Sequence, residues 1–276
     1  MKARQRKRIR LALRLAAALA LIVFFLFPLY WLFMMSFKTA DEIFAYPPRW
    51  WPGQISFDTY AVLFKDGDAA TVWNSFVVAG ASTVLAMLLG TMCAYSLARF
   101  RTGGEHLSNW IVSQRMVPPI AVVFPIFLMY VFFGWVDTYF GLILLYTAFN
   151  LPYVIWMMRG YILDIPLSLE EAAMVDGCTR WQVFLKVVLP MSRAGFFATA
   201  ILTFVFAWNE FLFALVFTRT EVTTYTVQVT HYFGGQSNFW AKISAMSVLG
   251  TVPIFVIVAF MQRYLVRGIS LGAVKG

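Results

Sequence analysis

Six long apolar stretches separated by more polar, charged connections constrain this chain more than any other feature. A run of about 20 apolar residues is long enough to cross the hydrocarbon core of a bilayer as a helix. With hydrophobic residues at 61% and charged residues at 13%, the chain leaves no room for a sizeable soluble domain. The sequence therefore predicts an all-α, polytopic membrane protein with six transmembrane helices. The predicted spans cover about residues 15–36, 73–97, 109–133, 140–158, 194–217 and 243–262.

The positive charges are distributed unequally between the connections. With the N-terminus inside, the cytoplasmic segments hold 16 Lys and Arg residues and the outer segments hold five. This asymmetry follows the positive-inside rule, so both termini are predicted to be cytoplasmic. The basic residues flank apolar stretches and form no single stripe, so nucleic acid is not an expected partner. The predicted parts are a basic cytoplasmic N-terminus (1–14), one transmembrane domain (15–276), a cytoplasmic loop (159–193) and outer loops (37–72 and 218–242).

The long cytoplasmic loop has the pattern of two short helices joined by a bend. Ser168 and Glu171 have the spacing of a capping box at the start of the first helix. Gly177 suits the left-handed turn that ends such a helix. Apolar residues at helical spacing over 181–189 predict a second, one-sided helix that Pro190 closes.

Several motifs resemble those of bacterial ABC importer permeases. The run Glu171-Ala172-Ala173, followed after three residues by Gly177 and later by Leu189-Pro190, is similar to their EAA loop. Four further motifs resemble the carbohydrate, or maltose-type, branch of that family and occur in the family's order. They are Ser36-Phe37-Lys38-Thr39, Met116-Val117-Pro118-Pro119, Trp208-Asn209-Glu210-Phe211 and the terminal Gly272-Ala273-Val274-Lys275-Gly276.

This resemblance implies a type I ABC importer permease fold and a role in transport of a sugar, oligosaccharide, glycoside or polyol across the bacterial inner membrane. The implied partners are membrane lipid, a second, homologous permease as heterodimer partner, two cytoplasmic ATPase subunits and an extracytoplasmic solute-binding protein. ATP and Mg²⁺ would be bound by the ATPase subunits, and this chain contains no GxxxxGK[ST] phosphate-binding loop. The resemblance assigns the coupling contact with the ATPase to Glu170, Glu171, Ala172, Ala173, Asp176 and Gly177.

Polar groups within the spans are the candidates for a translocation pathway. Ionisable groups at membrane depth are costly unless paired or hydrated, so Glu210 marks a pathway or a buried network. Arg115 either reaches the cytoplasmic interface or contributes to a gate. Direct pairing of these two is not expected, because each is about 10 Å from a different face of a core about 30 Å thick. The candidate pathway residues are Arg115, Asn150, Trp208, Asn209 and Glu210, with structural contacts between helices as the alternative role.

Two outer segments carry weaker signals. By resemblance, Gly234, Gly235 and Gln236 correspond to the loop that contacts the solute-binding protein, although a double glycine also suits any exposed hairpin. Trp50 and Trp51 suit the headgroup region as anchors, and a docking surface is an equal alternative.

The sequence contains no catalytic constellation and no metal-ligand spacing, so an enzyme is not expected. The alternative function is an ion-coupled secondary transporter of a small polar solute. Such transporters commonly have internal repeats and several intramembrane acids, whereas this chain has one acid within its predicted spans and no evident repeat.

Overall fold

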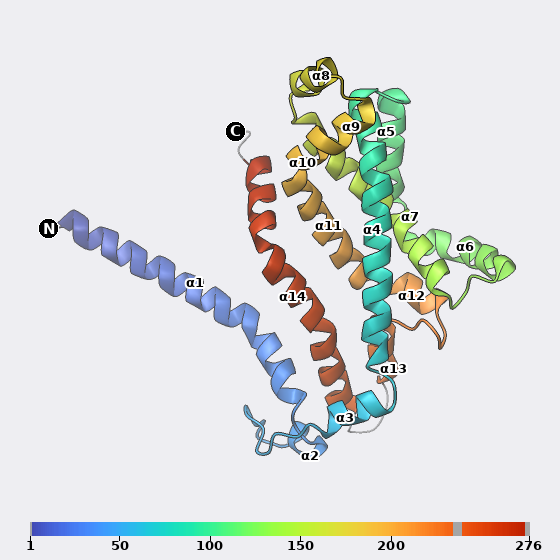
Figure 1. Cartoon of the computed structure of the whole chain (residues 1–276). Helices are drawn as coiled ribbons and strands as arrows, with labels where there is room; N and C mark the ends of the chain where they lie inside the picture. The colour runs from blue at the N-terminus through green and yellow to red at the C-terminus, as the bar shows by residue number, and fades with distance from the viewer. Residues whose placement is uncertain (1, 234–238, 274–276) are drawn as a thin grey trace. The chain divides into compact units, whose positions relative to one another are not determined.

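The computed structural model describes residues 2–233 and 239–273, with side chains for 9–233 and 239–260. This part of the chain is helical and contains no strand (Figure 1). The helices are α1 (Lys2–Met35), α2 (Ala40–Ile43), α3 (Asp58–Lys65), α4 (Ala70–Arg99), α5 (Gly104–Ser113), the 3₁₀ turn η1 (Gln114–Met116), α6 (Pro119–Phe133), α7 (Tyr139–Leu163), α8 (Leu167–Val175), α9 (Arg180–Val183), the π-helical segment η2 (Phe184–Val188), α10 (Leu189–Met191), α11 (Arg193–Trp208), α12 (Leu212–Phe217), α13 (Tyr225–His231) and α14 (Phe239–Ala273).

Four helices are long and apolar enough to cross a membrane: Ile9–Met35, Ala70–Arg99, Tyr139–Leu163 and Phe239–Phe260. Two bent pairs raise the number to six if each pair forms one span. The first joins Gly104–Met116 to Pro119–Phe133 at 93°, and the second joins Arg180–Met191 to Arg193–Trp208 at 77°.

The two breaks within predicted spans have different origins. The break between Met116 and Pro119 follows from the adjacent prolines, which lack backbone donors and disfavour helix at the preceding residue. The predicted span 194–217 was expected to be one helix, and this is wrong. It is interrupted between Trp208 and Leu212, although the interruption contains neither proline nor glycine.

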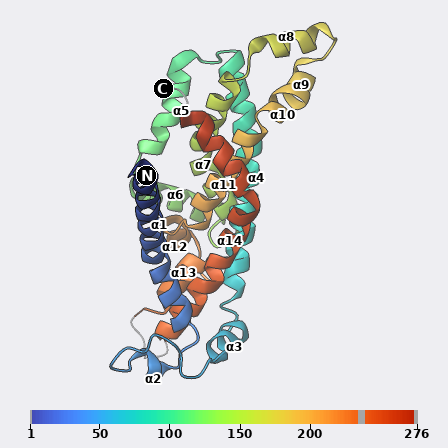
Figure 2. The same cartoon turned by 90° about the vertical axis from the view of Figure 1, so that its left-hand side faces the viewer.

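The chain divides into two compact units, of which the second consists of Ala70–Gln228 and the residues from Val252 onward. In the second unit α4 packs along α7, and α11 packs against both helices (Figure 2). One apolar cluster includes Val78, Tyr146 and Trp208, and another includes Met87, Met158 and Val188. Burial of these side chains helps to hold α4, α7 and α11 together, and through Val188 it includes η2.

Two glycines allow this close packing. A Cβ atom at Gly90 on α4 would lie 2.6 Å from Cγ1 of Val154 on α7. A Cβ atom at Gly195 on α11 would lie 2.2 Å from Cγ of Tyr161, also on α7. Small residues at helix contacts permit this approach within lipid, where water does not drive helices together.

The first unit consists of the chain up to Ala69 and Val229–Thr251. In this unit the connection between α2 and α3 folds back onto α1 through aromatic contacts. The Trp50 ring lies 5.7 Å from that of Trp31 and 6.0 Å from that of Phe27. Lys38 is buried, donates to the carbonyl of Arg49 and lies 4.5 Å from the Trp31 ring. Burial lowers the pKa of Lys38, and the nearby carboxylate of Glu42 opposes that change.

In the second unit, Asp137 fixes the connection between α6 and α7 to the segment after α12. Its carboxylate accepts four backbone N–H groups, from residues 219–222, at 2.9 to 3.2 Å. Burial alone would raise the pKa of Asp137, but these hydrogen bonds to the charged form outweigh burial and lower the pKa. The carboxylate therefore stays ionised at neutral pH and holds the two connections together.

Candidate coupling loop and transmembrane cavity

The loop between α7 and α11 forms the two predicted short helices, with corrections at their ends. The first is α8, which begins after Pro166 without a side-chain cap, so the capping box predicted for Ser168 and Glu171 is wrong. A capping box occurs instead at the second helix. There the backbone N–H of Thr179 donates to Oε1 of Gln182 at 2.8 Å, and the backbone N–H of Gln182 donates to Oγ1 of Thr179 at 3.3 Å.

The turn after α8 is a Schellman motif. The Gly177 amide donates to the Met174 carbonyl at 3.1 Å, and the Cys178 amide donates to the Ala173 carbonyl at 3.0 Å. Gly177 has φ of +88°, as predicted, and a Cβ atom there would meet nothing within 4 Å. The second helix was expected to stop at Pro190. It instead continues through η2 and ends at Met191. Pro190 lies near the start of α10, where its missing donor costs little.

The predicted coupling residues divide between the exposed and the buried face of α8. Glu171, Ala172, Asp176 and Gly177 are exposed, and Ala173 is partly buried against the core. Val175, which the sequence analysis did not single out, is 88% exposed. Glu170 is 3% exposed, so its carboxylate is not available to a partner protein in this conformation.

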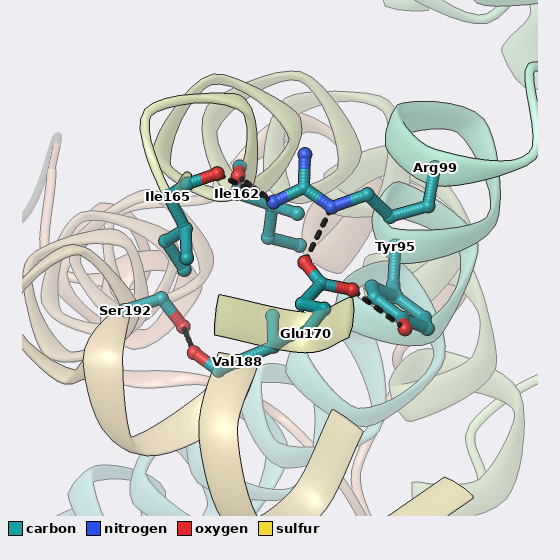
Figure 3. A network of polar contacts seen from close by, with 7 residues as sticks. All are labelled: Tyr95, Arg99, Ile162, Ile165, Glu170, Val188 and Ser192. Carbon is teal, nitrogen blue, oxygen red and sulfur yellow. Dashed lines mark hydrogen bonds and ion pairs between the residues drawn. The ribbon is translucent and has the colours of Figure 1, made fainter. Parts of the chain in front are cut away.

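Glu170 belongs to a buried polar network (Figure 3). Its Oε1 accepts a hydrogen bond from Nε of Arg99 at 2.5 Å, and its Oε2 accepts one from the hydroxyl of Tyr95 at 3.0 Å. Nη2 of Arg99 donates to the carbonyls of Ile162 and Ile165 at 2.8 and 2.9 Å. Removing one partner of such a pair would leave a buried charge uncompensated, at a cost of about 3–5 kcal/mol.

A cavity of about 550 Å³ lies in the second unit, where both helix breaks meet α7. Its polar lining comes from Gln114 and Arg115 at the first break, Glu210 at the second break, and Tyr146 and Asn150 on α7. Phe149, Phe206 and Phe213 contribute aromatic surface. Non-helical backbone at membrane depth is tolerated where it lines such a cavity.

Arg115 contributes a cation to this cavity. Its Nη1 donates to the carbonyl of Phe149 at 2.9 Å, and its guanidinium carbon lies 5.1 and 5.7 Å from the rings of Phe206 and Tyr153. Within the described ranges, no carboxylate lies within 4 Å of Arg115. Arg115 and Glu210 line the same cavity, and among the described residues no ion pair joins them, in line with the expectation that they do not pair directly.

Glu210 and Asn150 also have structural contacts. The Glu210 carboxylate accepts the backbone N–H groups of Phe213 at 3.0 Å and Ala214 at 3.1 Å, so it caps α12. The Asn150 amide is buried and donates to the carbonyl of Tyr146 at 2.9 Å. Backbone N–H groups of α12 thus satisfy the Glu210 carboxylate, and a backbone carbonyl of α7 satisfies the Asn150 amide.

The structure places the other candidate pathway residues elsewhere. Trp208 is 1% exposed and packs between Phe204 and Tyr225, whose ring centres lie 5.6 and 5.1 Å away. Asn209 is exposed outside the cavity lining and donates to the carbonyl of Val205 at 2.8 Å. The predicted binding-protein contact at Gly234, Gly235 and Gln236 lies outside the described residues.

Several residues at both sites were not found from the sequence. Arg99 and Tyr95 are at the cytoplasmic end of a predicted span, where an arginine and a tyrosine are ordinary interfacial residues. Their four-residue spacing on one helix face, together with the doubled acid at 170–171, is a signal that was available. Phe149 and Phe206 are indistinguishable in sequence from lipid-facing phenylalanines.

Residues 86–271 match the family described as binding-protein-dependent transport system inner membrane component. The chain is 36% identical to the trehalose transport system permease protein SugB of Mycobacterium tuberculosis, over 91% of this chain and 93% of that protein. It is also 36% identical to the sulfoquinovosyl glycerol transport system permease protein SmoH of Agrobacterium fabrum, over 93% and 91%. The chain belongs to this family.

The fold is similar to that of solved importers. One is a bacterial ABC transporter that imports the acidic polysaccharide alginate, with a TM-score of 0.74, 22% identity, and 93% of this chain and 96% of that chain covered. Another is the MetNI methionine ABC transporter, with a TM-score of 0.58, 18% identity, and 78% and 99% covered.

The permease is therefore a membrane component of an ABC importer and a transport subunit rather than an enzyme. This membership confirms the resemblance inferred from the EAA spacing. None of these relatives or structures supports the alternative of an ion-coupled secondary transporter.

Proposed function

We propose that this permease moves a sugar, oligosaccharide, glycoside or polyol across the bacterial inner membrane. The observation that carries the proposal is 36% identity, over nine-tenths of the chain, to permeases named for trehalose and sulfoquinovosyl glycerol transport. The cavity is consistent with such a substrate, since aromatic rings suit the faces of sugars and Asn150 and Arg115 offer polar groups.

The proposed topology has six membrane crossings with both termini in the cytoplasm. The charge asymmetry of 16 against five basic residues supports it, as do the four long helices and two bent pairs. In this topology residues 1–14 form the cytoplasmic N-terminus, 15–276 form one transmembrane domain, and α8 to α10 belong to the cytoplasmic coupling loop.

The exposed face of α8 is the proposed docking site for a cytoplasmic ATPase subunit. The ATPase would contact Glu171, Ala172, Asp176 and Gly177, with Ala173 at the edge of the contact. Glu170 would instead fix the buried face of α8 to Arg99. ATP and Mg²⁺ would be bound by two ATPase subunits and not by this chain. ATP-driven closure of those subunits would then move α8 and switch the permease between inward-facing and outward-facing states.

The remaining partners complete the proposed assembly. A homologous second permease would pair with this chain as a heterodimer, and lipid would cover its outer helices. A solute-binding protein would deliver the substrate to the outer loops, including Gly234, Gly235 and Gln236. In the pathway, Arg115, Asn150 and Glu210 would line the route, and Trp208 and Asn209 would fix the backbone that positions Glu210.

The substrate class is tested by ATP hydrolysis in nanodiscs that contain the assembled transporter with its binding protein. Across a panel of sugars, glycosides, polyols and amino acids, we expect stimulation by a member of the first three groups. A binding protein that cannot bind solute serves as the control. Stimulation by an amino acid alone would contradict the proposed substrate class.

A further inference from the structure

The buried network around Glu170 joins three elements that are distant in the sequence. Arg99 is the last residue of α4, Ile162 and Ile165 supply carbonyls at the end of α7, and Glu170 is on α8 (Figure 3). One guanidinium contacts all three elements. Its side chain is 9% exposed and that of Glu170 is 3% exposed, so water competes little with these bonds.

The shape of the guanidinium explains why arginine occupies this position. Nε donates to the carboxylate of Glu170, while Nη2 bridges the carbonyls of Ile162, in the last turn of α7, and Ile165, just after it. A lysine carries one compact ammonium group and cannot hold this planar fork. Tyr95, one turn earlier on α4, satisfies the second carboxylate oxygen and also packs 5.1 Å from the Phe184 ring in η2.

Apart from Glu170, α8 is held by its packing on α9 and η2 and by the short connection to α7. Its outward face is exposed at Leu167, Leu169, Met174 and Val175, and Ala173 provides a small apolar contact with the core. Two side-chain hydrogen bonds, both accepted by Glu170, connect α8 to Tyr95 and Arg99 on α4. These bonds therefore give α8 a direct polar connection to α4, in addition to its short covalent connection to α7 and its packing on α9 and η2.

We propose that Arg99 is a positioning residue for energy coupling, because its contacts with Glu170 and the end of α7 make α8 move as one body with α4 and α7. Tyr95 supports the same carboxylate. The inference rests on the proposed docking of an ATPase on α8. It assigns to Glu170 a role inside the permease instead of a contact with the ATPase.

A double variant separates this role from a purely structural one. Arg99→Met alone or Glu170→Gln alone leaves a buried group without its partner, so reduced amounts of folded permease are expected for either. Arg99→Met combined with Glu170→Gln removes both charges and is expected to restore assembly. The hydrogen bonds between α4 and α8 are still missing in this double variant. The amount of solute transported per ATP hydrolysed should therefore remain at least about fivefold below wild type, which is the lower end of the range for coupling between two sites.

The experiment measures solute uptake and ATP hydrolysis together in proteoliposomes of the full complex. The matched control is Lys242→Met combined with Asp66→Asn, which removes a more exposed ion pair of 3.2 Å and should leave the ratio unchanged. Arg99→Lys should give a ratio of solute transported to ATP hydrolysed between that of wild type and that of the double variant. A wild-type ratio in the assembled Arg99→Met/Glu170→Gln variant would overturn the proposal.

A variant on the exposed face distinguishes failure of this inference from failure of the docking proposal. Ala172→Arg places a long charged side chain on exposed α8 and should prevent co-purification of the ATPase. Normal co-purification and uptake by this variant would contradict docking, and with it the role of Arg99. Lost co-purification, together with a wild-type ratio in the double variant, would overturn the role of Arg99 alone.

Discussion

Replacing Gly177 by valine is expected to reduce solute uptake at least about tenfold, within the range of site-to-site coupling, while leaving the permease folded in the membrane. Gly177 has φ of +88°, a conformation that costs a β-branched residue about 1–3 kcal/mol. No atom lies within 4 Å of a Cβ atom placed there, so the cost is confined to the turn after α8. A changed turn would shift the exposed end of α8, where the ATPase is proposed to dock.

Gly67 provides a matched control for this substitution. It has φ of +84° and likewise no atom within 4 Å of an added Cβ, but it lies between α3 and α4. Gly67→Val should therefore carry a similar backbone strain without affecting coupling. Uptake and membrane abundance would be measured for both variants. Normal uptake by Gly177→Val, or an equal loss in Gly67→Val, would count against the coupling role.

The second large effect is expected at the contact between α7 and α11. Gly195→Leu should prevent accumulation of folded permease, because even a Cβ atom would lie 2.2 Å from the Tyr161 ring. Inserting further carbons into a well-packed contact costs about 1–3 kcal/mol or more, and here the ring has to leave its site. The measurement is size-exclusion chromatography of the detergent-extracted protein with a thermal unfolding scan.

Gly160, within α7, is the control because an added Cβ there would meet nothing within 4 Å. Gly160→Leu should be neutral or stabilising, since leucine is favoured over glycine in helices by about 1 kcal/mol or less. A monodisperse Gly195→Leu variant at the wild-type level and unfolding temperature would show that α7 and α11 do not pack as described.

The sequence predicts the helices of this fold well because its signals are local. Long apolar runs identify the long helices, and Pro118 and Pro119 explain the first break. The break at 209–211 could not be predicted in this way. It is stabilised by Glu210, whose carboxylate binds the N–H groups at the start of α12 in place of a continued helix. From the sequence alone, an acid that caps a helix cannot be distinguished from any other acid within a span.

The candidate site was only partly predictable for the same reason. The turn at Gly177 follows from local conformational preference, and the structure confirms it. The partner of Glu170 is 71 positions away, and only the packing of α4 against α7 brings Arg99 to that carboxylate. Trp208 was selected as part of the cluster with Asn209 and Glu210. Phe204 lies four residues earlier on the same helix, but the contact with Tyr225, which completes the burial of Trp208, cannot be read from sequence spacing.

The most direct test of the account is solute uptake into proteoliposomes containing the whole complex, with ATP enclosed on the side of the ATPase subunits and ion gradients collapsed by ionophores. We predict accumulation of a sugar, glycoside or polyol that requires enclosed ATP and the binding protein and is insensitive to the ionophores. Uptake that proceeds without ATP and follows a proton or sodium gradient would contradict ATP-driven import.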